Sequence, residues 1–183
     1  MDSYELSIAG LTRTLPLVEV APGVRIASFV MLGDTALVEA VAAALADRPE
    51  MKGVELLVCP EAKAIPLTHA LARILGVDYV VARKSLKSYM TEAIVQPVVS
   101  ITTEGTQILA FNGPDLARMR GRRVGIVDDV VSTGGSLASL EGLLAQVPCT
   151  VAVRAAALLE EGGHSGEGLV YLAKLPIFVE PVA

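Results

Sequence analysis

Short apolar runs alternate along the chain with longer segments in which apolar residues recur at helical spacing. One run covers 54–59 and ends at Pro60, and a second covers 77–82. Between them a helix is predicted to begin near Pro66 and to end at Gly76, because proline favours the first helical turn and glycine the position after the last. A strand, a helix and a second strand in this order indicate parallel pairing with a right-handed crossover.

The same alternation extends over most of the chain. A helix is predicted to start at Gly33-Asp34-Thr35, where an Asp or Thr side chain can cap the first turn. The other predicted elements are short strands or a cover within 6–29, strands at 94–101 and 106–111 joined as a hairpin around 103–105, a turn at 112–114, a core strand at 124–127, a helix from about Gly135, a core strand at 150–159, and one or two short strands in the tail. Together they indicate an α/β fold with a mostly parallel central sheet flanked by helices.

In sheets of this kind, ligands bind beyond the carboxyl ends of the strands. This rule selects the loops at 59–66, 83–92 and 128–136. The third loop combines acids, hydroxyls and glycines, so it is the main candidate for a binding site.

That third loop joins a carboxylate pair to a phosphate-binding type of turn. Asp128 and Asp129 follow the predicted strand, and after two valines comes Ser132-Thr133-Gly134-Gly135-Ser136. Glycines let a backbone approach a phosphate, hydroxyls add donors, and the dipole of the following helix favours negative charge. Two acids would repel that phosphate unless they meet something else, either sugar hydroxyls or Mg²⁺. A ribose 5-phosphate satisfies both demands.

Two other interpretations of this segment are weaker. A solvated turn followed by an ordinary helix start would explain each feature alone, but less readily all of them in this order. A P-loop phosphotransferase is disfavoured, because no Gly-x-x-x-x-Gly-Lys-Ser/Thr is present and the glycines follow two acids.

The segment resembles the phosphoribosyl pyrophosphate (PRPP) signature of type I phosphoribosyltransferases, most closely the adenine enzymes, with some likeness to the xanthine enzymes. The resemblance implies that Asp128 and Asp129 hold the ribose hydroxyls, with Asp129 also catalytic. It implies that the 5-phosphate is bound by Ser132, Thr133, Gly134, Gly135 and Ser136.

A second stretch, Cys59-Pro60 followed by residues 61–64, looks like the pyrophosphate loop of the adenine enzymes, which carries a non-proline cis peptide. Arginine usually stands in that family where this chain has Lys63, which is expected to be catalytic here. The resemblance implies pyrophosphate contacts for Glu61, Ala62, Lys63, Ala64, Arg83 and Lys87. Lys84 is a further candidate for a pyrophosphate or lid contact.

The resemblance also implies a hood over the base and a mobile lid. The hood comprises about 1–32 and the C-terminal tail, and the lid and hairpin about 84–105, within a single domain of 1–183. Base contacts are expected from Val24, Ile26 and Val131. The adenine enzymes place an aromatic residue and an arginine where Ile26 and Ala27 stand. Glu92 and Glu104 are candidate acids or bases in the lid, and Glu160 and Glu161 could touch the purine. His69 and His164 are expected to be structural.

The implied activity is transfer of the phosphoribosyl group from PRPP to a purine base, adenine first, in purine salvage. Mg²⁺ would bind mainly through PRPP and pyrophosphate, with no metal held by side chains alone, and the protein would form a homodimer. The alternatives are a non-catalytic PRPP- or nucleotide-binding regulator of the same fold and a xanthine- or guanine-type phosphoribosyltransferase.

Composition limits the partners further. The 183 residues suit one domain, and 52% are hydrophobic, enough for a sizeable core. A net charge of −5 argues against nucleic acid. The sequence shows no signal peptide and no apolar run near the roughly 20 residues of a membrane helix. The two cysteines lack metal-ligand spacing. We expect a cytoplasmic protein without a membrane partner.

Overall fold

The central sheet contains five strands that run parallel to one another. The computed structural model describes residues 2–98 and 107–179. The strand order is β10-β9-β8-β4-β5, and all four neighbouring pairs are parallel. The strands are β4 (Leu56–Pro60), β5 (Asp78–Ala82), β8 (Arg123–Val131), β9 (Thr150–Glu160) and β10 (Val170–Leu175). The predicted fold class is therefore confirmed. Strand β10 is one of the short strands expected in the tail, and it joins the central sheet as its fifth strand.

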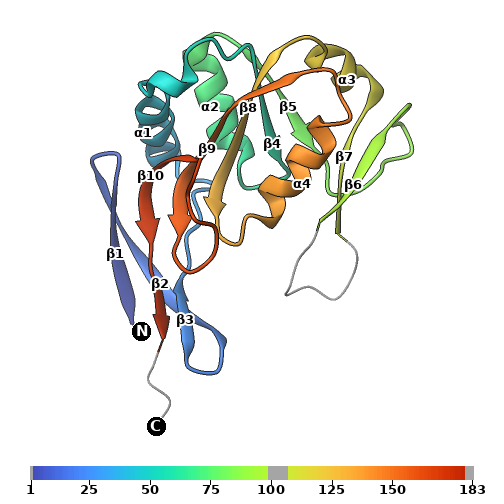
Figure 1. Cartoon of the computed structure of the whole chain (residues 1–183). Helices are drawn as coiled ribbons and strands as arrows, with labels where there is room; N and C mark the ends of the chain where they lie inside the picture. The colour runs from blue at the N-terminus through green and yellow to red at the C-terminus, as the bar shows by residue number, and fades with distance from the viewer. Residues whose placement is uncertain (1, 99–106, 180–183) are drawn as a thin grey trace.

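Helices cover both faces of this sheet (Figure 1). They are α1 (Thr35–Ala46), α2 (Ile65–Leu75), α3 (Gly113–Met119) and α4 (Gly135–Leu144), with a short 3₁₀ helix at Pro49–Met51. Residues of α1 and α2 pack with Leu57 in one buried cluster, whereas residues of α4 pack with Leu56 and Val58 in another. Successive residues of β4 thus point to opposite faces, as a strand requires. Within the described residues, no helix is both long and apolar enough to cross a membrane.

Helix boundaries follow the signals in the sequence where those signals are unambiguous. The side chain of Asp34 caps α1 by accepting a hydrogen bond from the Leu37 amide at 3.1 Å. Pro66 stands in the first turn of α2, and Gly76 ends that helix in the left-handed conformation at φ 67°. Helix α3 was not predicted, because Gly113-Pro114 is typical of a turn as well as of a helix start.

A two-stranded antiparallel hairpin leaves the central sheet beside α4. It consists of β6 (Ile94–Val98) and β7 (Gln107–Phe111), paired from Ile94↔Phe111 to Val98↔Gln107. The predicted turn at 103–105, the strand end at 99–101, Glu104 and the last part of the predicted lid lie outside the described residues.

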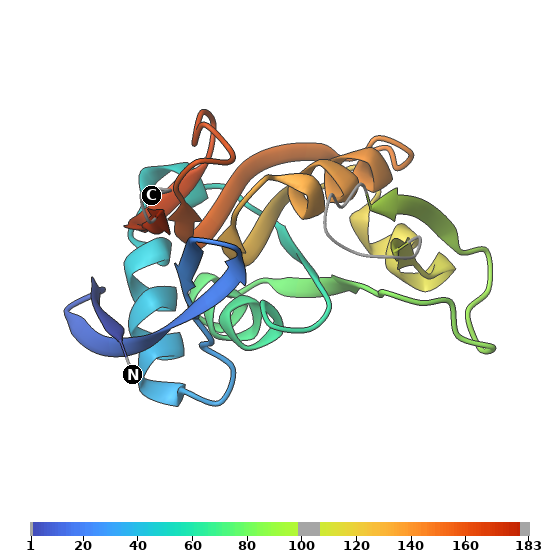
Figure 2. The same cartoon turned by 90° about the horizontal axis from the view of Figure 1, so that it is seen from below.

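A second sheet joins both ends of the chain. Its order is β1-β2-β3-β11, with β1 (Ser3–Ile8), β2 (Leu11–Ala21), β3 (Val24–Ala27) and β11 (Ile177–Val179) paired antiparallel. We call these four strands the hood sheet. It lies toward the carboxyl ends of the central strands, on the opposite side from the β6–β7 hairpin (Figures 1 and 2). Only short strands or a cover were predicted within 6–29, but the structure has a regular sheet there. Alternate residues such as Leu6 and Ile8 are buried, as in a strand with one face on the core.

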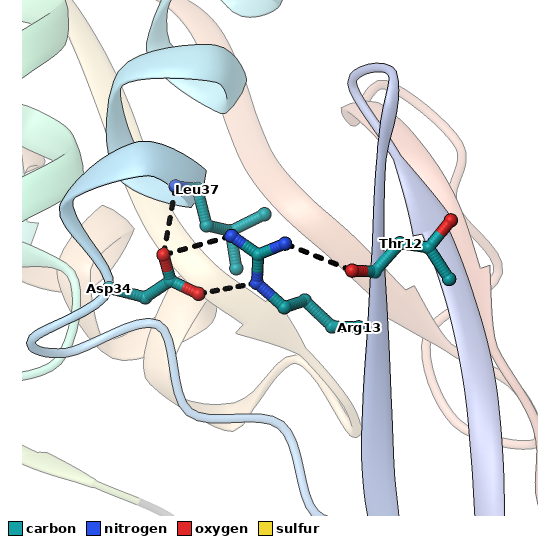
Figure 3. Close-up of polar contacts among 4 residues, drawn as sticks. All are labelled: Thr12, Arg13, Asp34 and Leu37. Carbon is teal, nitrogen blue, oxygen red and sulfur yellow. Dashed lines mark hydrogen bonds and ion pairs between the residues drawn. The ribbon is translucent and has the colours of Figure 1, made fainter.

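One ion pair ties the hood sheet to α1 (Figure 3). The Arg13 guanidinium donates from Nε to Asp34 at 2.6 Å and from a terminal nitrogen to the other carboxylate oxygen at 3.1 Å. Arg13 also donates to the Thr12 carbonyl at 2.9 Å. The hydrogen bonds from Arg13 and from the Leu37 amide lower the pKa of Asp34. Asp34 therefore serves both as helix cap and as anchor for β2.

Replacing Asp34 by alanine is expected to lower the free energy of unfolding by about 1 kcal/mol, the usual cost of a lost N-cap. Asp34→Asn should lower the free energy of unfolding by less, since asparagine also caps helices. Because the folded-state pKa is lowered, the ion pair stabilises the fold above the ordinary carboxyl pKa and this contribution is lost as pH falls through the folded-state value. Urea unfolding at pH 7 and pH 3 tests this. Equal pH dependence in wild type and Asp34→Asn would contradict it.

Candidate active site

Strand β8 is longer than predicted and contains both residues of the carboxylate pair. The predicted strand 124–127 continues to Val131, so Asp128 and Asp129 belong to the strand. On one side β8 pairs with β9 as far as Val131↔Leu159, which explains the extension. On the other side the pairing of β8 with β4 ends at Ile126. Beyond that point, the loop that follows Pro60 lies beside the two acids in place of β4.

The two acids are nearly buried, yet they line cavities. Each is 7% exposed. A cavity of about 100 Å³ runs along 130–137 and includes Asp128. An adjoining cavity of about 200 Å³ includes both acids, and its other lining residues are Pro60, Glu61, Ala62, Lys63, Ala64, Lys84, Val98, Gln107, Leu109, Val130 and Ser136. Asp128 and Ser136 therefore stand where the two cavities meet, and a ligand can reach the carboxylates.

Burial and repulsion make Asp128 an unusual acid. Burial raises its pKa well above the ordinary aspartate value, and the neighbouring charge of Asp129 raises it further. The Asp129 amide donates to Asp128 at 2.9 Å, and this bond and the charge of Lys84 act in the opposite direction. Such a pair is relieved by a ligand that donates hydrogen bonds to it or carries positive charge.

The whole phosphate-binding turn lines the smaller cavity. All five predicted residues, 132–136, line it, and Ser136 also lines the larger one. Gly134 adopts the left-handed conformation at φ 85° and precedes α4, so the turn opens directly into a helix N-terminus. The Thr133 side chain is exposed, whereas the Ser132 hydroxyl donates to the Glu160 carboxylate.

The loop after β4 forms another wall of the larger cavity. The peptide between Glu61 and Ala62 is cis, which confirms the expectation from the family resemblance. The Glu61 carboxylate accepts hydrogen bonds from the Lys84 amide at 2.9 Å and from Arg83 Nε at 3.2 Å. The Lys84 amide and the charges of Arg83 and Lys87 lower the Glu61 pKa. Glu61 thus fixes the end of β5 against this loop.

The structure separates the cations predicted for pyrophosphate. Lys63 and Lys84 line the larger cavity, and Lys84 is close enough to affect Asp128. Arg83 instead forms an ion pair with Glu61 and lines a different cavity, whose residues include Tyr79, Tyr89 and Arg118. Lys87 lines neither cavity at Asp128.

The residues predicted for the base are also separated. Val131 lines the smaller cavity, whereas Val24 and Ile26 lie in β3 of the hood sheet and line neither cavity at Asp128. Three hairpin residues that line the larger cavity, Val98, Gln107 and Leu109, were not predicted. Nothing in their spacing distinguishes them from ordinary strand residues, and only the folding of the hairpin over α4 brings them there.

A metal ion at this site would need ligands from the substrate. In the described parts of the chain, no three His, Cys, Asp or Glu side chains are grouped to hold one. Asp128 and Asp129 offer carboxylate oxygens, which suit Mg²⁺, and Mg²⁺ commonly completes its shell with water and substrate phosphates. The residues therefore fit Mg²⁺ that arrives with a phosphorylated ligand.

Comparison with known proteins agrees with this geometry. The phosphoribosyl transferase domain model matches residues 32–171. An "HGPRTase-like protein 3" of Haloterrigena turkmenica is 32% identical over 136 residues, which are 74% of this chain and 61% of that protein. The chain thus spans less than two thirds of that relative.

Two further comparisons extend over more of the chain. The adenine phosphoribosyltransferase of Mycobacterium tuberculosis is 34% identical over 174 residues, 93% of this chain and 76% of that enzyme. The crystal structure of the adenine phosphoribosyltransferase from Thermoanaerobacter pseudethanolicus superposes with a TM-score of 0.69 at 22% identity, and the match covers 87% of this chain and 95% of that one. Because the domain model covers most of the chain and a relative that is 34% identical covers nearly all of it, this chain belongs to the phosphoribosyltransferase family.

Proposed function

We propose that the protein transfers the phosphoribosyl group from PRPP to a purine base, with adenine as the first choice, and releases pyrophosphate. One observation carries the proposal: Asp128 stands where the cavity of a phosphate-type turn meets a lysine-bearing cavity, and Asp129 lines the second cavity beside it. PRPP has the same order of groups, a 5-phosphate, a ribose and a diphosphate. The relatedness to the M. tuberculosis adenine enzyme supports the choice of base.

In this arrangement the 5-phosphate binds to 132–136 and the ribose hydroxyls donate to Asp128 and Asp129. Hydroxyl donors would relieve the repulsion that raises the Asp128 pKa. The diphosphate extends toward Lys63 and Lys84, which supply positive charge from the cavity wall. Glu61 acts through the residues it holds, Arg83 and the Lys84 amide, while the backbone of 61–64 lies along the diphosphate.

The reaction breaks the bond between C1 of the ribose and the diphosphate oxygen, and forms one between C1 and a purine nitrogen. Positive charge develops at C1 as the bond breaks, and the Asp129 carboxylate, which lines the larger cavity, would stabilise it. Lys63 stabilises the departing diphosphate. Mg²⁺ bound through PRPP would neutralise part of the same charge. The β6–β7 hairpin limits the access of water, which would otherwise hydrolyse PRPP.

The base would bind between Val131 and the hood sheet, where Val24 and Ile26 of β3 would contact it. We further propose a single domain in which 1–32 and the tail cover the base and 84–105 cover the diphosphate. A cytoplasmic homodimer completes the proposal. The HGPRTase-like relative keeps guanine-type bases open as alternatives to adenine.

Assays with Mg²⁺, PRPP and each of adenine, hypoxanthine, guanine and xanthine test the proposal by pyrophosphate release and nucleotide formation. We expect turnover with adenine. Faster turnover with another base would change the substrate but keep the reaction class. PRPP binding without turnover on any base would show a nucleotide-binding regulator of the same fold instead.

Replacing Thr133 by alanine is expected to raise the Michaelis constant for PRPP by roughly tenfold, because a hydrogen bond to a charged phosphate is worth about 1.5–3 kcal/mol. The Thr133 side chain is exposed and lines the smaller cavity, so the melting temperature should not change. Thr150→Ala is the matched control, because Thr150 is the first residue of β9 and lies at the end of the strand away from Glu160 and the turn. Equal Michaelis constants in Thr133→Ala and Thr150→Ala would show that the turn does not hold the phosphate.

A further inference from the structure

The loop between β9 and β10, residues 161–169, packs against the phosphate-binding turn (Figure 1). The His164 amide donates to the Ser132 carbonyl at 2.8 Å. The Ser132 hydroxyl donates to Glu160, the last residue of β9. Ser132 is thus held through its backbone and through its side chain by one neighbouring segment.

This arrangement changes what Ser132 can do for a ligand. A serine hydroxyl has one proton to donate. In Ser132 that proton is committed to Glu160, so the hydroxyl fastens the turn from behind and does not donate to a phosphate. The donors left to the turn are its backbone amides and the exposed hydroxyls of Thr133 and Ser136.

Two glycines mark where the segments meet. A Cβ added to Gly163 would lie 2.4 Å from the Ser132 carbonyl oxygen and 3.1 Å from the Thr133 Cα. These are backbone atoms, so they can move only if the turn itself moves. A Cβ added to Gly134 would lie 2.8 Å from the His164 ring. That ring is fixed in turn, because its Nδ1 accepts a hydrogen bond from the Gly166 amide at 2.9 Å.

We propose that Glu160, Gly163 and His164 are positioning residues that set the shape of the phosphate-binding turn and thereby the affinity for the 5-phosphate of the substrate. The inference rests on the proposed function, since it names a determinant of substrate binding at the same site. None of the three lines the cavities at Asp128, so they act through Ser132 and Gly134.

The first test compares Glu160→Ala, Glu160→Gln and Ser132→Ala, with PRPP affinity measured by calorimetry. Glu160→Ala and Ser132→Ala should each weaken PRPP binding on the order of tenfold, since displacements of about 1 Å cost up to a hundredfold. The double variant should be no weaker than either single variant, because both remove the same bond. Glu160→Gln retains an acceptor for the Ser132 hydroxyl and should restore most of the affinity.

The opposite pattern would overturn the inference. If the Ser132 hydroxyl binds phosphate directly, Ser132→Ala weakens PRPP binding, whereas Glu160→Ala leaves it unchanged or tightens it by removing a negative charge. Wild type that binds neither PRPP nor ribose 5-phosphate would overturn the proposed function as well, which separates the two failures.

Gly163→Ala gives a second, independent test. It should raise the Michaelis constant for PRPP on the order of tenfold or more while that for the base stays unchanged, a split that a general loss of stability would not produce. Gly142→Ala is the matched control, because the three atoms nearest to its Cβ would all belong to the flexible Gln96 side chain, which can turn away. Equal effects on both substrates, or none, would contradict the positioning role.

Discussion

Replacing Asp129 by asparagine is expected to reduce kcat/KM for PRPP by about a hundredfold or more, the usual loss when one preorganised electrostatic group is removed from a transition state. Asp129 lines the larger cavity beside Asp128, and its carboxylate can accept two hydrogen bonds from ribose hydroxyls. Asparagine keeps one acceptor, turns a donor toward the hydroxyls, and carries no charge to oppose the one that develops at C1. Steady-state pyrophosphate release measures the loss.

Stability should not follow activity in this variant. The charge of Asp129 raises the pKa of Asp128, which means that the two carboxylates repel each other in the folded protein. Asp129→Asn removes this repulsion, so the melting temperature should stay the same or rise. Asp47→Asn, an exposed change at the end of α1, is the control for charge alone. An Asp129→Asn enzyme with wild-type kcat/KM would refute the assignment of the ribose site.

The largest loss of stability is expected from Leu57→Ala, about 3 kcal/mol, within the range for fully buried leucines. Leu57 is 0% exposed and is the second residue of β4. Its Cδ2 lies 2.9 Å from the position that a Cβ of Gly125 would occupy, so the glycine of β8 makes room for this side chain. Loss of the isopropyl group leaves a cavity that a packed sheet cannot close. Guanidinium unfolding monitored by circular dichroism gives the value.

Leu32→Ala is the control for this prediction. Leu32 is 52% exposed, and such surface changes usually stay within 0.5 kcal/mol. If both leucines cost the same, the two buried clusters would not be the source of stability that the structure indicates.

The central sheet could be predicted because its signals are local. Pro60 after an apolar run, Pro66 in a first turn and Gly76 in the left-handed conformation each determine the backbone over a few residues. The end of β8 could not be predicted in this way. Whether Asp128 belongs to a strand or a loop depends on its pairing with Ala156 of β9, which a local pattern does not reveal.

The candidate site divides along the same line. The contiguous set 128–136 could be recognised from its chemistry, because acids, hydroxyls and glycines follow one another in the chain. The contacts made by Gln107 and Glu160 could not, since each is brought to the site by a distant strand. Arg83 and Lys84 show that even neighbouring residues can differ in a way that the sequence does not reveal. They are adjacent cations, yet Lys84 lines the larger cavity, whereas Arg83 pairs with Glu61 from a distant part of the chain and lines another cavity.

The hood sheet has a consequence for how the protein is made. Its third strand, β3, pairs on one side with β2 and on the other with β11, from the far end of the chain. During translation β3 emerges well before β11, so the edge of β3 that pairs with β11 stays open until the central sheet between them has been made. Pairing across so long a separation in sequence is slow compared with local pairing. A nascent chain therefore carries an open strand edge while the central sheet is being translated, a stage at which contact with a neighbouring nascent chain is damaging.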